Sequence, residues 1–341
     1  MCILCNNLGM SKELKKFLNA NHISLDNKFA TLYNNQCDNA SQVYSLIENA
    51  HMHVFFDVTY ACDLSCAHCI YSADSNQPLT FIPTKDISFL INQARKEREH
   101  VCAFALFGGE PTLAEIHNKG YLKTVADSVR ANKNSLRMST NGNWINGEHA
   151  NYMIEQLVYV YKTAPRFQLQ ISVDRFHKNS VQSATKIIQE LDKYDEIIGK
   201  HNIVIRGFEF DKNLAQHFDS MKTNNIVVGT YFYFNLIPSG RAASLPMATK
   251  RSEDTRAIIL GDDEISGNIA LSALGPCSLC NRFQIELHFT PDGKVFTFDK
   301  LDYTKHITDA KNPDGSYKTY KQIKHDLAEL IFARYQNQIR K

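Results

Sequence analysis

Residues 55–74, FFDVTYACDLSCAHCIYSAD, join an apolar, strand-like run to three closely spaced cysteines. Cys62, Cys66 and Cys69 follow the run in a CxxxCxxC spacing. Thiolates are soft ligands that suit iron–sulfur clusters and zinc. Three thiolates on a [4Fe–4S] cluster would leave one iron without a protein ligand. An open coordination position of this kind is typical of a catalytic metal site. The alternatives are a zinc site completed by His68 or a distant ligand, and three unrelated cysteines.

Around this loop the chain alternates between strand-like and helix-like segments. Alternation of this kind predicts a parallel sheet, either open or curled into a full or partial β/α barrel. The six strands are expected to begin at His53, Val101, Leu136, Phe167, Ile203 and Val227, and the helices to span Pro83 to Arg98, Leu113 to Lys133, His149 to Lys162, Ser180 to Tyr194 and Lys212 to Thr223.

Several of these strands carry polar residues along one side. In FQLQISVD, Gln168, Gln170, Ser172 and Asp174 alternate with apolar residues. A parallel strand that is covered on both faces would be apolar throughout. A curled sheet whose concave face lines a wet cavity explains the pattern best, and polar ends on an open sheet are the alternative.

The chain divides into three predicted parts. Residues 1–50 are expected to form an N-terminal helical cap, residues 51–240 a partial (β/α)6 TIM-like barrel of the α/β class, and residues 241–341 an extension. In the extension, FQIELHF and KVFTF flank Pro291-Asp292-Gly293 and predict a β-hairpin, and a helix is expected from Lys318 to Gln338.

The composition is that of an ordinary globular protein. The 341 residues are 43% hydrophobic and 22% charged, which excludes wholesale disorder. A formal net charge of +2 gives no reason to expect a nucleic-acid or anionic-membrane partner. No secretory signal or apolar stretch of membrane-spanning length is present in the sequence, so a cytoplasmic protein is expected. Nine cysteines at low density disfavour a disulfide framework.

The three-cysteine segment resembles the signature of the radical S-adenosylmethionine (radical SAM) superfamily, CxxxCxΦC after the first strand of a partial β/α barrel. His68 stands at Φ, where an aromatic residue is usual. The resemblance implies that Cys62, Cys66 and Cys69 hold a [4Fe–4S] cluster whose open iron is chelated by SAM, with His68 beside the adenine. It also implies reductive cleavage of SAM to a 5′-deoxyadenosyl radical, which abstracts a hydrogen atom from the substrate.

A second motif follows the second predicted strand. Gly108, Gly109 and Glu110, followed by proline, resemble the GGEP motif of the superfamily, which is assigned to the SAM amino group. A glycine-rich turn at a helix start is the alternative.

Polar residues at the carboxyl ends of later strands resemble SAM-lining positions. Ser139, Asn141, Ser172 and Asp174 can bond ribose hydroxyls or the methionine carboxylate, or they can serve as helix caps and turns. Arg206 lies within an apolar run and needs a partner if it is buried. The SAM carboxylate and an ion pair with Glu209 are its two candidates.

The region after the barrel resembles the start of a twitch or SPASM extension. Its features are a CxxC at Cys277 and Cys280 and the preceding Ile237-Pro-Ser-Gly-Arg-Ala242. Phe298 stands where that pattern has a cysteine, and no cysteine follows Cys280, so a complete SPASM domain with two auxiliary clusters is excluded.

The only other CxxC outside the first loop is Cys2 and Cys5. These could meet Cys277 and Cys280 in a four-thiolate site, iron–sulfur or zinc, that would give a second, auxiliary cluster. A frayed N-terminus is the alternative. Cys102, at the start of its strand, is interpreted as a core residue.

By analogy with peptide-modifying radical SAM enzymes, the expected substrate is a peptide or protein side chain, with an external electron donor. A small metabolite is the alternative substrate. A non-catalytic iron–sulfur or zinc protein is the alternative from another class. The sequence assigns no catalytic residue beyond the cofactor-binding positions.

Overall fold

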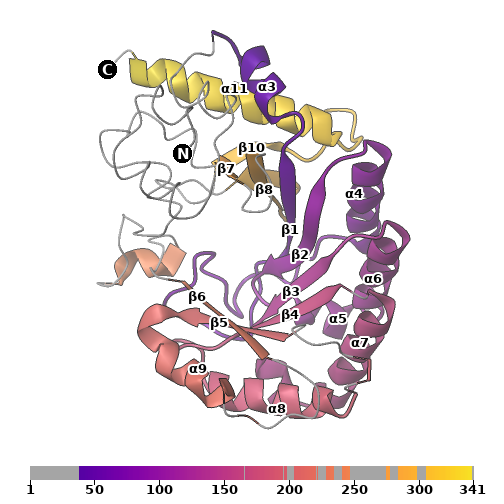
Figure 1. Ribbon diagram of the computed structural model, residues 1–341, viewed down its shortest axis with the longest axis vertical. Coiled ribbons are helices and arrows are strands. Elements are labelled where there is room, and N and C mark those ends of the chain that lie inside the picture. The colour runs from indigo at the N-terminus through magenta and orange to yellow at the C-terminus, as the bar shows by residue number, and fades with distance from the viewer. Residues whose placement is uncertain are drawn as a thin grey trace, which may run out of the picture.

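The computed structural model describes residues 38–164, 166–194, 196–197, 203–219, 221, 228–233, 240–245, 274–276, 283–297 and 305–339. Six parallel strands form an arc, with helices along its outer side (Figure 1). All six begin within two residues of the predicted positions, so the α/β partial-barrel prediction is confirmed. They are β1 (His51–Thr59), β2 (Val101–Gly108), β3 (Leu136–Thr140), β4 (Phe167–Ser172), β5 (Ile203–Phe208) and β6 (Val228–Tyr233), hydrogen-bonded in that order.

The helices follow the predicted alternation with one break. They are α4 (Thr84–Lys96), α5 (Thr112–His117), α6 (Tyr121–Ala131), α7 (Ala150–Thr163), α8 (Ser180–Asp192) and α9 (Lys212–Asp219). The sequence predicts one helix from Leu113 to Lys133, but Gly120 adopts a left-handed conformation at φ +88° and separates α5 from α6. The buried Glu115 carboxylate accepts hydrogen bonds from the Gly120 and Leu122 backbone N–H groups, which stabilises this corner.

The polar side of β4 lies on the inner face of the arc. In β4, Phe167, Leu169 and Ile171 are buried, and the residues between them are half-buried. The buried set packs against the helices, as the predicted alternation requires. A short 3₁₀ segment, η2 (Asn143–Asn146), follows β3.

The C-terminal strands extend the same sheet. They are β7 (Leu274–Pro276), β8 (Phe283–Phe289), β9 (Lys294–Thr297) and β10 (Lys305–Asp309). The predicted hairpin is β8 and β9, and β10, which the sequence analysis missed, pairs with β9. Strand β8 pairs in parallel with β1, which gives the order β10-β9-β8-β1-β2-β3-β4-β5-β6. The sheet therefore crosses the predicted boundary at residue 240, and the three-part division remains a prediction.

Two helices from opposite ends of the sequence pack together. Helix α3 (Ala40–Ile47) lies beside α11 (Tyr320–Ile339), as Figure 1 shows. The Lys324 side chain of α11 is 1% exposed and pairs with Glu99, just before β2. Within the part of the chain that the structure describes, no helix is long and apolar enough to cross a membrane.

Candidate iron–sulfur and SAM site

The cysteine loop leaves the carboxyl end of β1 and closes on itself. Its two ends meet at a parallel bridge between Ala61 and Asp74, where the Cys62 N–H donates to the Asp74 carbonyl at 3.1 Å. Inside the loop, the Cys69 N–H donates to the Cys66 carbonyl at 3.2 Å, and the Ser72 N–H donates to the Cys69 carbonyl at 3.3 Å. These turns fix the spacing of the three thiols.

The thiols lie among hydrogen-bond donors. The Leu64 N–H donates to Cys62 Sγ at 3.4 Å, and the Ala73 N–H donates to Cys69 Sγ at 3.3 Å. Donors of this kind stabilise a thiolate. Burial raises the pKa of the Cys62 thiol, and the nearby Glu110 carboxylate raises it further. Without a metal this thiol is protonated, so binding of a metal at Cys62 would release a proton.

The two glycines of the Gly-Gly-Glu-Pro segment allow β2 to approach the start of the loop. The Gly109 N–H donates to the Thr59 carbonyl at 2.7 Å, and the Glu110 N–H donates to the Ala61 carbonyl at 2.9 Å. A Cβ atom at Gly109 would lie 2.0 Å from the Ala61 carbonyl oxygen, and one at Gly108 would lie 2.5 Å from that of Thr59. No larger residue fits at either position without a backbone shift.

The Glu110 carboxylate is 1% exposed and is bound by its own neighbours. It accepts hydrogen bonds from the Thr112 N–H and hydroxyl, the Thr140 hydroxyl at 2.8 Å and the Asn141 N–H at 2.8 Å. Burial raises its pKa to about 7. In this structure Glu110 joins the ends of β2 and β3, so its predicted role at the SAM amino group would need a change in these contacts.

Asn141 contacts the cysteine loop directly. Its Nδ2 donates to Asp63 Oδ1 at 2.8 Å and lies 3.6 Å from Cys62 Sγ, and its Oδ1 accepts from the Asn143 N–H at 2.7 Å. The predicted polar residue at the end of β3 therefore lies at the cluster loop, where it supports Asp63 and Cys62.

The predicted SAM residues of β3, β4 and β5 share the inner face. Arg206 Nη1 donates to Ser139 Oγ at 2.8 Å and to Gln170 Oε1 at 2.7 Å, and its guanidinium lies 5.6 Å from the centre of the Phe107 ring. Ser172 pairs with Arg206 across β4 and β5. The structure thus brings Ser139, Ser172 and Arg206 to one patch of the barrel interior.

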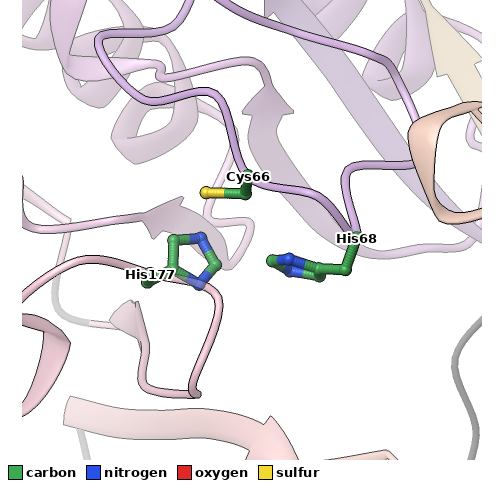
Figure 2. Close-up of side chains that lie close together, drawn as sticks. All are labelled: Cys66, His68 and His177. Atoms are coloured by element: carbon green, nitrogen blue, oxygen red, sulfur yellow. The ribbon is translucent and has the colours of Figure 1, made fainter. Parts of the chain in front are cut away.

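The predicted site residue His68 lies beside His177 close to Cys66 (Figure 2). The predicted site residue Asp174 contacts both histidines. Asp174 Oδ1 accepts hydrogen bonds from the Phe176 and His177 N–H groups, and Asp174 Oδ2 lies 2.8 Å from His177 Nδ1. Asp174 thus forms the turn that the sequence analysis gave as its alternative role. The His68 ring stacks on Phe176 with centroids 4.7 Å apart, and its buried Nδ1 has no hydrogen-bond partner among the described residues.

The two imidazoles differ in charge. Burial lowers the pKa of His68 to about 4, so this ring is neutral at pH 7. Burial alone would lower the pKa of His177 as well, but Asp174 and Cys66 outweigh it and raise the pKa to about 10. Burial would likewise raise the pKa of Asp174, but the hydrogen bond from His177 outweighs it and lowers the pKa. A neutral ring and an ion pair therefore lie side by side next to Cys66.

The three thiols fit a cluster better than a single ion. Among the described residues, the one group of three possible ligand atoms within 4.8 Å of one another is Cys66, His68 and His177. Cys62, Cys66 and Cys69 form no such group, although thiolates on one zinc ion, at about 2.3 Å each, would converge this closely. In a cubane each thiolate binds a different iron, which suits the separated thiols.

Arg241, which the sequence analysis did not assign to the site, contacts the loop from far along the chain. It lies in η4 (Gly240–Ser244), and its Nε donates to the Cys66 carbonyl at 3.0 Å. The only sequence signal was the resemblance of residues 237–242 to a linker in related enzymes.

A second missed group lies inside the barrel at the β1–β8 edge. The buried Asp57 carboxylate lies 3.1 Å from His288 Nδ1 and accepts a hydrogen bond from the Tyr71 hydroxyl at 3.2 Å. The His288 ring stacks on Phe55 with centroids 4.4 Å apart. This group joins the cysteine loop, the barrel and the C-terminal hairpin. An aspartate within an apolar strand was the available signal for it.

Four predicted metal ligands lie outside the described residues: Cys2, Cys5, Cys277 and Cys280. Cys102, in contrast, is described, and its Sγ lies 3.6 Å from His51 Nδ1 at the opposite end of β1 from the loop.

Comparisons with known proteins give one relative and several similar folds. No family model matches the chain. The mycofactocin maturase MftC of Mycolicibacterium smegmatis is 23% identical over 298 residues, which is 81% of this chain and 71% of MftC. Native anSMEcpe with bound AdoMet and Cp18Cys peptide has a TM-score of 0.49 at 13% identity, covering 84% of this chain and 83% of that chain. BtrN in complex with AdoMet and 2-DOIA has a TM-score of 0.43 at 12% identity, covering 85% and 89%.

The fold and the loop define the class of the protein: a partial β/α barrel with a three-cysteine loop at the carboxyl ends of its parallel strands. Over 81% of its length the chain is similar in sequence to MftC, a maturase.

Proposed function

We propose that this protein is a radical SAM enzyme, which uses a [4Fe–4S] cluster and S-adenosylmethionine, and that it modifies a peptide or protein substrate. The observation that supports the proposal is the relationship to MftC, a maturase, over 81% of the chain. A small metabolite is the alternative substrate, because the barrel fold alone does not determine the substrate class.

In this proposal Cys62, Cys66 and Cys69 hold the cluster, and the bound cluster and SAM supply one-electron cleavage and hydrogen abstraction. The protein's residues position these groups. Gly108 and Gly109 allow β2 to approach the loop, and His68 would bind the adenine. The remaining proposed SAM residues are Glu110, Ser139, Asn141, Ser172, Asp174 and Arg206.

The substrate class is tested by 5′-deoxyadenosine formation. The reduced enzyme is incubated with SAM, alone and with candidate peptides encoded near its gene. Peptide-dependent 5′-deoxyadenosine and a mass change in the peptide would support the proposal. Stimulation by a small metabolite but by none of the peptides would contradict it. A full cluster without any SAM cleavage would argue for a non-catalytic protein.

We also propose a second, four-thiolate site at Cys2, Cys5, Cys277 and Cys280. Two [4Fe–4S] clusters would give about eight irons per chain and one cluster about four. Cys280→Ala is expected to remove about half of the iron and to leave the SAM-binding cluster in place. Four irons in both the wild-type and the variant chain would contradict the second cluster.

A further inference from the structure

Arg241 makes four hydrogen bonds to the cysteine loop. Besides Nε to the Cys66 carbonyl, Nη2 donates to the Ala73 carbonyl at 2.6 Å and Nη1 contacts Asp74 Oδ2 at 3.2 Å. The Arg241 backbone N–H donates to the Cys69 carbonyl at 3.0 Å. One residue therefore contacts the loop at two of its three cysteines and at its closing end.

The side chain suits this task. A guanidinium carries five N–H donors in a fixed planar fork and keeps its charge at all working pH values. Here the fork spans two carbonyls and one carboxylate, and only 25% of the side chain is exposed. A lysine ammonium is a compact point charge and cannot reach three acceptors that are spread along the guanidinium fork.

These bonds supply partners that the short loop cannot provide alone. The Cys66 and Cys69 carbonyls each accept one bond inside the loop and a second from Arg241. Asp74 joins the end of the loop to Ala61 through the backbone and to Arg241 through its side chain. Loss of the guanidinium would free the middle of the loop, at Cys66, to move relative to its closed ends.

We propose that Arg241 is a positioning residue of the cluster site, through which the segment after the barrel holds Cys66 and Cys69 in place to bind iron. The inference rests on the assignment of the cluster to Cys62, Cys66 and Cys69, and it is independent of the substrate. In this proposal both the cysteine loop and η4 are needed to form the cluster site.

The test compares Arg241→Ala and Arg241→Lys with the wild type in the anaerobically reconstituted full chain. Arg95→Ala is the control, because Arg95 Nη1 of α4 also donates to a backbone carbonyl, that of Ala131 in α6, away from the loop. The readouts are iron and sulfide per chain, the rate of iron loss to EDTA, and the EPR spectrum of the reduced cluster.

We expect Arg241→Ala to lose iron about tenfold faster than the wild type and to show an altered EPR spectrum. The rate of iron loss from Arg241→Lys should lie between those of Arg241→Ala and the wild type, and the rate from Arg95→Ala should equal that of the wild type. Wild-type loss rates and spectra in Arg241→Ala would overturn the proposal. If Arg241→Ala does not accumulate as folded protein, the test rests on Arg241→Lys. A rate of iron loss in Arg241→Lys equal to that of the wild type would then overturn the proposal.

Two failures remain distinguishable in this design. A wild-type chain that binds no cluster would overturn the cluster assignment and this proposal together. A wild-type chain that holds the cluster but shows no peptide-dependent reaction would contradict only the proposed peptide substrate.

Discussion

The Glu110 carboxylate, after β2, accepts a hydrogen bond from the Asn141 backbone N–H, after β3, at 2.8 Å. The bond joins two strand ends beside the cysteine loop, where Glu110 is 1% exposed. A buried carboxylate costs free energy when it ionises, and Glu110 accordingly has a pKa of about 7 in the folded chain.

The free energy of unfolding should therefore fall as the pH rises from about 4.5 to about 7, the range between the unfolded and folded pKa values of Glu110. The unfolded chain loses this proton near pH 4.5, and the folded chain retains it to about pH 7. Between these values the folded state binds more protons, so the contribution present at low pH is lost as pH rises. At about 1.4 kcal/mol per pH unit, the loss is about 3 kcal/mol.

Glu110→Gln cannot ionise and should lack this fall in stability. Urea unfolding of the cluster-free protein at several pH values, followed by fluorescence of Trp144, the single tryptophan, measures the slope. Trp144 is a suitable reporter because it is 5% exposed and its Nε1 donates to Thr140 Oγ1. Parallel pH profiles for the two proteins would refute this role of Glu110.

Gly109→Ala should destabilise the loop and impair cluster binding. Its Cβ would lie 2.0 Å from the Ala61 carbonyl oxygen, so the backbone must shift, at a cost of about 3 kcal/mol or more. Gly147→Ala is the control, since the nearest atom there lies 3.6 Å away. The melting temperature and the iron content check the pair, and equal values in both variants would contradict the close approach.

Most of the barrel could be predicted from the sequence because its signals are local. In β4 the alternation of Leu169 and Ile171 with glutamines indicates both the strand and its buried side. The break at Gly120 could not be predicted in this way, because the helical pattern continues through it. It depends on Glu115, whose carboxylate binds the backbone on both sides of the turn.

The candidate site could also be predicted only in part. The three cysteines and the two glycines could be found because they lie in short motifs at strand ends. Arg241 could not, because its contact with Cys66 spans 175 residues and leaves no periodic trace in the sequence. The hydrogen bonds of Glu110 to Thr140 and Asn141 were missed for a related reason, since strand neighbours come together only after the sheet forms.

Lys324→Met should loosen the attachment of α11 to the barrel. Lys324 is 1% exposed and pairs with Glu99, so its loss leaves a carboxylate that is 11% exposed without its cation. Breaking a buried pair in this way costs about 3 to 5 kcal/mol. The exposed pair Lys193–Glu190 provides the control, and Lys193→Met should cost less than about 1 kcal/mol.

The double variant Lys324→Met/Glu99→Gln separates two contributions to the loss of stability: the unpaired Glu99 carboxylate and the packing of α11. If most of the cost comes from the stranded carboxylate, removal of its charge should recover part of the lost stability. Urea midpoints of the four proteins complete the cycle. Equal losses in the single and the double variant would show that packing of α11, and not the ion pair, determines the effect.

Cys66→Ala should abolish SAM cleavage, because the proposed cluster would lose one of its three proposed protein ligands. With the first cluster lost, iron at this site should fall from about four atoms per chain toward zero. Cys102→Ala is the matched control. It removes a thiol from the same barrel, at the opposite end of the sheet from the loop, where Cys102 lies beside His51. Iron, sulfide and 5′-deoxyadenosine are measured after anaerobic reconstitution and dithionite reduction. The control should retain wild-type values, and an unchanged yield of 5′-deoxyadenosine in Cys66→Ala would contradict the assignment of Cys66 as a cluster ligand.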